Sequence, residues 1–220
     1  MANAKLITLT DPRSPASEAF RTLRTNIMFS SVENPITTLT VSSPAQGEGK
    51  STLIANMAVT FAQGGNKTIL VDCDLRRPSQ HEIWDVENER GLTTMILEDA
   101  AISSPPLVET EVDNLQLLPS GPVPSNPADI ISSQRMNEVI GVLKARANYV
   151  LFDSPPVLAA TDAALLASKT DGVLLVIRAG HTRRDQAARA RQALERVHVR
   201  IVGAVLSNAP REDSGEYYGL

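Results

Sequence analysis

The chain has 220 residues, 42% of them hydrophobic, which is enough for one large domain with a full core. Its net charge of −4 provides no broad positive surface for a nucleic-acid backbone, so we exclude nucleic acid as the main partner. The single cysteine, Cys73, excludes an internal disulfide and, with no apolar signal segment and no run long enough to span a membrane, predicts a cytoplasmic protein.

The first predicted element is a helix over residues 14–29. Ser14 can cap this helix, and Pro15 suits its first turn. An apolar stripe at helical spacing would face the protein, with Glu18, Arg21 and Arg24 beside it. From spacing alone, these three charges predict a solvated face with one weak ion pair.

Six apolar runs then predict the strands of a mostly parallel sheet. Several runs are almost unbroken in Val, Ile and Leu, as in strands that are buried on both faces. Because the runs alternate with helical patterns, we expect an α/β fold with helices on both faces of the sheet. The predicted strands are 36–43, 68–72, 114–121, 149–153, 172–179 and 201–208, and the helices are 51–64, 128–146, 160–168 and 182–197.

The segment VSSPAQGEGKST joins the first of these strands to a helix. Gly47 and Gly49 let the backbone turn its N–H groups toward a phosphate, and the helix start adds its positive dipole end. Lys50 can reach the β- and γ-phosphates, and the Ser51 hydroxyl can bind Mg²⁺. The strict motif has Gly where this chain has Pro44, and an ordinary Gly-rich turn is the alternative. The predicted nucleotide-binding residues here are Gly47, Glu48, Gly49, Lys50, Ser51 and Thr52.

Carboxylates stand at the ends of two further predicted strands. Asp72 and Asp74 end ILVDCD, and Asp153 ends YVLFD. Because the carboxyl ends of parallel strands meet at one edge of a sheet, we expect all three beside the Gly-rich loop. The alternative for the first pair is a solvated exit loop in which Arg76 and Arg77 pair with the aspartates. Three carboxylates near a polyphosphate need a cation, so the pattern predicts Mg²⁺.

The predicted nucleotide is ATP. The guanine-specific pattern Asn-Lys-x-Asp does not occur, because NKTI at 66–69 lacks the Asp. Asn208, at the end of the last predicted strand, is a candidate for contact with the base, although an Asn in a loop usually only makes a turn.

Together the motifs GEGKST, ILVDCDLR and VLFDSPP resemble those of the bacterial tyrosine kinases of capsule and exopolysaccharide synthesis, which have a P-loop NTPase fold. The N-terminal pattern of Glu18, Arg21 and Arg24 is similar to the family's Glu-x-x-Arg-x-x-Arg motif, and the resemblance spans about residues 18–208. In that family the N-terminal motif mediates contact between subunits, so the resemblance implies a ring-like homo-oligomer.

The resemblance also implies a role for each site residue. Lys50 would bind the phosphates, while Ser51 and Asp74 would hold Mg²⁺ directly or through water. Asp153 would support the metal site. Asp72 is the candidate that takes the proton from the acceptor phenol, which at its ordinary pKa near 10 is a poor nucleophile.

Finally, the resemblance implies a division of the chain. Residues 1–34 would be a helical arm for subunit contact, 35–209 the kinase domain, and 210–220 a tail with the phosphoacceptors Tyr217 and Tyr218. Relatives usually carry a larger tyrosine cluster. A membrane-anchored polysaccharide co-polymerase, in trans or as a fused segment, is implied as activator, and it would hold the chain at the inner face of the cell membrane.

Two other functions stay open. A partition or positioning ATPase shares the sheet and the phosphate loop but usually has an extra lysine early in that loop, where this chain has Ala45. A regulatory subunit would use nucleotide only to control ring assembly. The first predicts ATP-dependent dimers without phosphotyrosine, and the second predicts rings without transfer between subunits.

Overall fold

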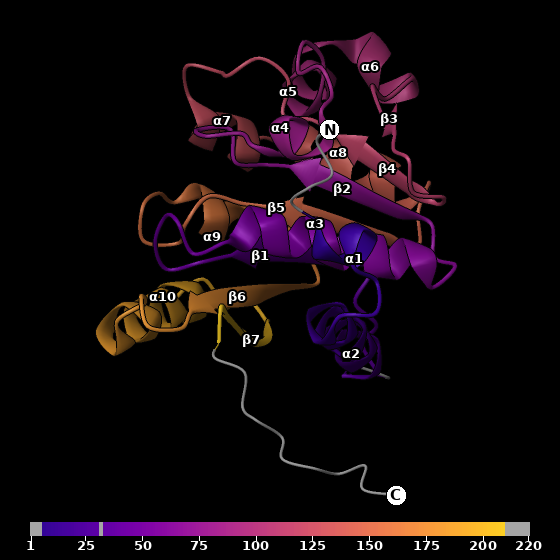
Figure 1. Cartoon of the computed structure of the whole chain (residues 1–220). Helices are drawn as coiled ribbons and strands as arrows, with labels where there is room; N and C mark the ends of the chain where they lie inside the picture. Colours follow the sequence, from indigo (N-terminus) through magenta and orange to yellow (C-terminus); the bar gives the residue numbers. More distant parts are fainter. Residues whose placement is uncertain (1–5, 31–32, 210–220) are drawn as a thin grey trace, which may run out of the picture.

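The computed structural model describes residues 6–30 and 33–209, which form a seven-stranded sheet with the order β3-β4-β2-β5-β1-β6-β7 (Figure 1). All neighbours pair in parallel except β3 and β4, so the predicted mostly parallel α/β fold is confirmed. All six predicted strands are present, and the two-residue β3 is additional. The strands are β1 (Thr38–Ser42), β2 (Thr68–Asp72), β3 (Val108–Glu109), β4 (Leu115–Leu118), β5 (Tyr149–Asp153), β6 (Gly172–Arg178) and β7 (Ile201–Ser207).

Helices cover both faces of this sheet. The helix predicted over 128–146 is divided in two, because the extended Ser133 ends α7 and its hydroxyl accepts a hydrogen bond from the Met136 N–H at the start of α8. The short helices α1, α4, α5 and α6 were not predicted. The helices are α1 (Ile7–Thr10), α2 (Pro15–Phe29), α3 (Lys50–Gln63), α4 (Gln80–Trp84), α5 (Leu92–Leu97), α6 (Asp99–Ser103), α7 (Pro127–Ser132), α8 (Gln134–Lys144), α9 (Asp162–Ala167) and α10 (Arg184–Glu195).

The core lies in apolar layers on the two faces of the sheet. On one face, side chains of β1, β5 and β6 pack against α3, with α1, α2 and α4 around it. On the other face, β2 and β5 pack against α5, α7, α8 and α9, and α10 covers β6. Strand β2 is buried along its whole length, as its apolar run predicts, and β1 is buried as well, although threonine and serine alternate with its apolar residues. The loops after β2, β5 and β1, three adjacent strands, therefore open at one edge of the sheet.

The N-terminal helices pack against α3. Ile27 of α2 is buried, and Phe20 and Leu23 are partly buried, so most of the predicted apolar stripe faces the core. In α1, the backbone N–H and the hydroxyl of Thr8 both donate to the buried amide of Asn56 on α3.

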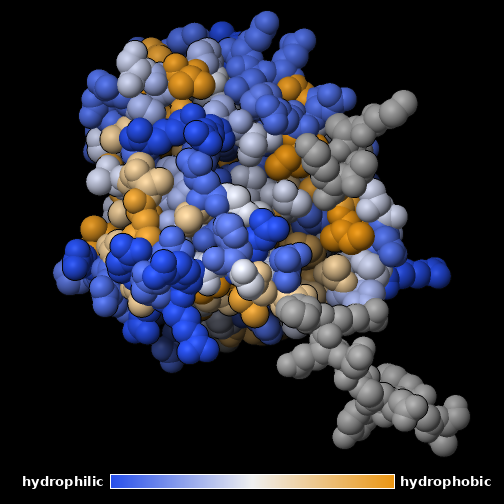
Figure 2. All heavy atoms as spheres, turned by 60° about the vertical axis from the view of Figure 1, so that its left-hand side comes forward, coloured by the Kyte–Doolittle hydropathy of each residue, from blue (hydrophilic) through white to orange (hydrophobic). Residues whose placement is uncertain are grey.

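On the face shown in Figure 2, hydrophobic side chains form separate patches among polar ones. Within residues 6–30 and 33–209, no helix has the length and hydrophobicity needed to cross a membrane.

Candidate functional site

The Gly-rich loop between β1 and α3 has the geometry of a phosphate-binding loop. Gly47 (φ +76°) and Gly49 (φ +83°) both take left-handed conformations that favour glycine, and a Cβ at either would meet only open space. No side chain caps α3 at Gly49, so the first N–H groups of the helix are available to an anion. From the sheet, Arg178 donates to the Gly47 carbonyl at 2.8 Å and the Ser207 hydroxyl to the Glu48 carbonyl at 2.9 Å.

Lys50 lies at the centre of the site. Its Nζ is 3.1 Å from Asp74 Oδ2 and 3.1 Å from Asp153 Oδ1, and it donates to Ser51 Oγ at 3.0 Å. Burial alone would lower the pKa of Lys50, but the nearby carboxylates of Asp153 and Asp74 outweigh burial and raise it. Lys50 therefore stays charged. The structure brings together the side chains predicted from three separate motifs.

Asp72 lies deeper than Asp74. Its side chain is 0% exposed, and Oδ2 accepts the backbone N–H groups of Ser79 and Gln80 at 2.9 Å each. Burial, and then the charge of Asp153, raise the pKa of Asp72 to about 7, against the lowering effect of those N–H groups and of Lys50. Asp72 thus has the pKa of a general base but no open path to a substrate in this conformation.

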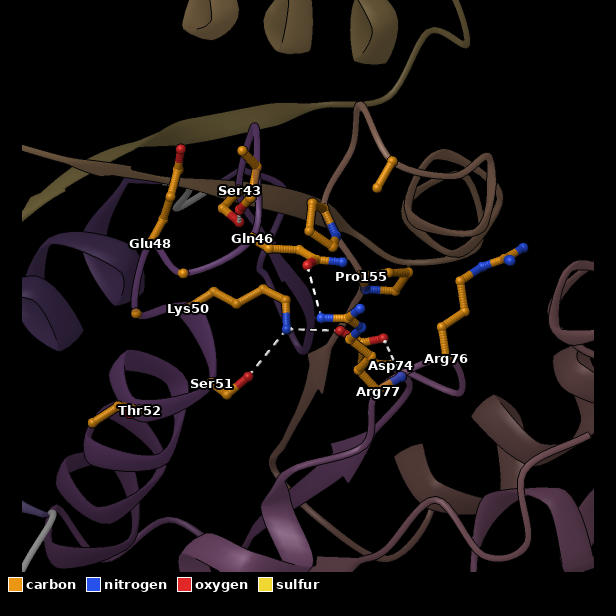
Figure 3. Close-up of a pocket in the computed structure, with 15 residues that line it drawn as sticks. Ser43, Gln46, Glu48, Lys50, Ser51, Thr52, Asp74, Arg76, Arg77 and Pro155 are labelled. Atoms are coloured by element: carbon orange, nitrogen blue, oxygen red, sulfur yellow. Dashed lines mark hydrogen bonds and ion pairs between the residues drawn. The ribbon is translucent and has the colours of Figure 1, made fainter. Parts of the chain in front are cut away.

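A cavity of about 280 Å³ opens in front of Lys50 (Figure 3). The phosphate loop lines one side, and Asp74, Arg76 and Arg77 line the other, with the prolines after β5. In Figure 3 Lys50 points toward Asp74, whereas the Glu48 side chain points away from both. Burial raises the pKa of Glu48, whose side chain is 1% exposed. The geometry therefore favours a backbone contact between Glu48 and a phosphate.

A second cavity, of about 670 Å³, lies between α2, α3 and β7. It shares Glu48, Gly49 and Thr52 with the first cavity, so the two adjoin along the phosphate loop. Asn208, in a left-handed conformation after β7, lines this second cavity. The predicted phosphate and base contacts therefore lie on adjoining cavities.

Two arginines beside the site have partners other than those weighed from the sequence. Arg76 forms two hydrogen bonds with Asp162 at the start of α9, at 2.8 and 3.1 Å, and Asp162 is 1% exposed. Arg77 donates from its side chain to Gln46 of the phosphate loop at 3.0 Å. The alternative in which these arginine side chains pair with Asp72 and Asp74 is therefore wrong.

Sequence reasoning missed Gln80. This residue is 0% exposed, and its side-chain amide donates to Asp153 at 2.7 Å and to the Ser51 carbonyl at 3.1 Å. It follows RRPS in the chain and belongs to none of the motifs recognised above. The only signal was its nearness to Asp72 and Asp74.

The oxygen donors near Lys50 fit Mg²⁺ bound together with a nucleotide. Ser51, Asp74 and Asp153 offer hard oxygen ligands, the kind Mg²⁺ prefers. In the described part of the chain, no group of three or more acidic, histidine or cysteine side chains could hold a metal ion alone. Mg²⁺ commonly uses one or two carboxylates together with substrate phosphates and water, and this donor set matches that pattern.

The predicted contact motif on α2 is divided between two environments. Glu18 and Arg21 form an exposed ion pair at 2.7 Å, as spacing predicted. Arg24 instead donates to the Thr60 carbonyl near the end of α3 at 2.7 Å. The predicted phosphoacceptors Tyr217 and Tyr218 lie outside the described residues.

Comparison with known proteins gives one consistent result. A family model described as an AAA domain matches residues 36–198. The tyrosine-protein kinase YwqD of Bacillus subtilis is 41% identical over 212 residues, which cover 96% of this chain and 89% of YwqD. The crystal structure of the chimerical protein CapA2B2 superposes with a TM-score of 0.90 at 36% identity, covering 94% of this chain and 91% of that one.

A longer relative also matches. The tyrosine-protein kinase wzc of Salmonella typhi is 29% identical over 212 residues, which cover 96% of this chain but 29% of wzc. The matched segment is thus nearly the whole of this chain and a minor part of that relative.

Proposed function

The chain belongs to the family of the bacterial tyrosine-protein kinases, and we propose that its reaction uses Mg²⁺ and ATP to phosphorylate Tyr217 and Tyr218 of a neighbouring subunit. The observation that carries this proposal is the position of Lys50. Its cation lies at the N-terminus of α3, within 3.1 Å of carboxylates from the ends of β2 and β5. A buried cation, uncapped helical N–H groups and two acids provide what phosphoryl transfer needs from a protein.

The phosphates would bind where the helix start and Lys50 meet. The N–H groups of the loop and of the first turn of α3 would hold the phosphate oxygens, and Lys50 would exchange part of its contact with Asp74 and Asp153 for them. Mg²⁺, held by Ser51 and Asp74 with support from Asp153, would neutralise charge on the β- and γ-phosphates. Thr52 and Asn208 would lie toward the α-phosphate and the base, because both line the second cavity.

The acceptor phenol would enter the cavity on the side of Asp74, the acid that lines it. Asp72 remains the proposed general base, because a carboxylate with a pKa of about 7 can accept a proton near neutral pH. Because Asp72 is buried, the chain around it has to move before it can act as a base. The turn that donates the N–H groups of Ser79 and Gln80 to Asp72 has to open before a phenol can reach this carboxylate.

Regulation would come from charge in the tail. Each added phosphate brings about −1.5 to −2 charges next to Glu212, Asp213 and Glu216, which favours separation of packed subunits. We propose a ring-like homo-oligomer with contacts through Glu18, Arg21 and Arg24. We further propose a membrane-anchored co-polymerase as activator and a role in capsule or exopolysaccharide synthesis at the inner face of the membrane.

Phosphosite mapping tests this function. We expect incubation with Mg²⁺ and labelled ATP to place label on Tyr217 and Tyr218, and the double variant Tyr217→Phe, Tyr218→Phe to lose it. The third tyrosine, Tyr149, is an internal control, because its ring packs against Phe61 with 4.6 Å between centroids. Full labelling of the double variant would contradict the choice of acceptor.

The same experiment separates the alternatives. A partition-type ATPase would hydrolyse ATP and form nucleotide-dependent dimers without any phosphotyrosine. A regulatory subunit would form rings that gain no phosphate. Either result would replace the tail phosphorylation proposed here.

A further inference from the structure

Gln80 connects the acids of the site to each other and to α3. Its backbone N–H donates to Asp72 at 2.9 Å, and its side-chain Nε2 donates to Asp153 Oδ2 at 2.7 Å and to the Ser51 carbonyl at 3.1 Å. One residue therefore contacts the strand-end acids of β2 and β5 and the first turn of α3. It is 0% exposed, so water cannot replace these contacts at low cost.

The partners on both sides fix the orientation of the Gln80 amide. Its Oε1 accepts the indole N–H of Trp84 at 3.3 Å, while Nε2 faces a carboxylate and a carbonyl. Turning the amide over would place its oxygen against two acceptors and its NH₂ against a donor. The amide thus has one satisfied orientation, in which it donates toward the site.

Gln80 also donates a hydrogen bond to the second oxygen of the Asp153 carboxylate. Lys50 holds Oδ1 at 3.1 Å, and Gln80 holds Oδ2 at 2.7 Å, so each oxygen of this buried carboxylate has one donor. Two donors from different elements fix the plane of the carboxylate. Loss of the Gln80 donor would leave Oδ2 buried without this charge-assisted hydrogen bond and free the group to turn.

We propose that Gln80 is a positioning residue for the kinase reaction, which sets the orientation of Asp153 and passes changes at the site to Trp84. The kinetic part of this proposal rests on the proposed function, whereas the part that concerns Trp84 does not. Trp84 is the only tryptophan of the chain and is 8% exposed, so its fluorescence reports on this one hydrogen-bonded group. The competing interpretation is that Gln80 only fills the core.

A matched control exists on α3. Asn56 is also a buried amide, and its Oδ1 accepts from Thr8 while its Nδ2 donates to the Thr52 carbonyl at 2.8 Å. It makes as many side-chain hydrogen bonds as Gln80 but contacts none of the acids. Asn56→Leu therefore removes a buried amide whose hydrogen bonds reach the predicted nucleotide-binding residues only at the Thr52 backbone carbonyl.

The test compares Gln80→Met with Asn56→Leu, each corrected for its loss of thermal stability. We expect Gln80→Met to lower kcat for tyrosine phosphorylation about 10- to 100-fold with little change in KM for ATP, as outer-shell partners of metal-site ligands commonly do. Asn56→Leu should keep kcat within about threefold. Equal kcat values in the two variants would overturn the positioning role.

Fluorescence gives a readout that does not depend on turnover. We expect Mg²⁺ with ADP to change the Trp84 emission of the unmodified chain and of Asn56→Leu, but not that of Gln80→Met, although calorimetry detects nucleotide binding in all three. An unchanged response in Gln80→Met would contradict the link. If the unmodified chain phosphorylates no tyrosine, the proposed function fails while this readout still decides the role of Gln80.

Gln80→Glu covers the case in which Gln80→Met does not fold. Glutamate keeps the shape of glutamine but replaces the donor with a second carboxylate beside Asp153, so we expect a greater loss of kcat than in Gln80→Met. Activity equal to that of the unmodified chain would show that the donor at this position is not needed, and would overturn the proposal.

Discussion

Two regions border the same phosphate loop and differ in how far their side chains are exposed. The first is the buried acid cluster, which we define as Lys50, Asp72, Asp74 and Asp153. These four side chains are at most about one-tenth exposed, and each has at least two polar partners within the chain.

The second region is the α2–β7 rim, which we define as α2, β7 and the cavity between them. Here Glu18 is 67% exposed on its side chain, Leu206 is 58% exposed, and β7 is the outermost strand of the sheet on this side. The comparison indicates that the two regions serve different functions. The acid cluster is preorganised for chemistry, whereas the rim has polar and apolar groups to offer to a nucleotide base or another subunit.

The largest expected effect is at the acid cluster. Lys50→Met should reduce phosphotransfer by about a thousandfold, because it removes the cation that would meet the phosphates and leaves two buried carboxylates without it. Labelled ATP measures the loss. Lys67→Met, which removes an exposed lysine just before β2, is the control and should keep full activity. Equal loss in both variants would remove the special role assigned to the cluster.

The next largest expected effect is a loss of stability when the ion pair of Arg76 and Asp162, beside the acid cluster, is broken. Arg76→Ala should lower the free energy of unfolding by about 2 kcal/mol, because Asp162 is buried and would lose its charged partner. Urea titration measures this change. Arg77→Ala, which loses only a hydrogen bond to Gln46, should cost about 0.5 kcal/mol or less. The double variant Arg76→Ala, Asp162→Asn should recover part of the loss, and failure to do so would assign it to packing.

A third effect concerns pH. Because burial and Asp153 raise the pKa of Asp72 from 3.8 to about 7, the folded chain keeps a proton here that the unfolded chain releases. The contribution of this group to stability without Mg²⁺ and nucleotide should therefore be fully present below about pH 4 and be lost as pH rises toward about 7. Asp72→Asn should flatten that slope in thermal melts. An identical slope in the variant would show that Asp72 is already ionised.

The smallest effect on stability should occur at the rim. Glu18→Ala removes an exposed ion pair and should change the free energy of unfolding by less than about 0.5 kcal/mol. The same variant should nevertheless abolish the proposed ring, which size-exclusion chromatography with light scattering detects. Arg24→Ala should cost more stability, because it loses the partly buried hydrogen bond to the Thr60 carbonyl. If Glu18→Ala forms the same oligomers as the unmodified chain, the motif is a solvated helix face and not a subunit contact.

The same two regions differ in how far the sequence predicted them. The central strands β2 and β5 were predicted because their apolar runs are almost unbroken. The positions of Asp74 just after β2 and of Asp153 at the end of β5 placed both acids beside Lys50. The contacts of Gln80 were not predictable, because its partners Ser51 and Asp153 lie 29 and 73 residues away and glutamine marks no motif. The ion pair of Arg76 and Asp162 was not predicted either, because its two residues lie 86 positions apart in the sequence.

Local sequence patterns also failed to predict features that depend on tertiary contacts. Ser133 looked like a polar residue inside one helix, but its extended backbone and its cap of α8 divide that helix in two. The spacing of the α2 motif predicted one ion pair on a solvated face and no partner for a second arginine. Only the packing of α2 on α3 brings Arg24 to the Thr60 carbonyl and leaves Arg21 with Glu18.

A mixing experiment tests the central claim most directly. Lys50→Met keeps the tail but lacks the catalytic cation, and Tyr217→Phe, Tyr218→Phe keeps the site but lacks the acceptors. Incubated together with Mg²⁺ and ATP, the two variants should yield phosphate on Tyr217 and Tyr218 of the Lys50→Met chain, although neither variant alone gains any there. Absence of phosphotyrosine from the mixture, while the unmodified chain labels its tail, would contradict phosphorylation between subunits.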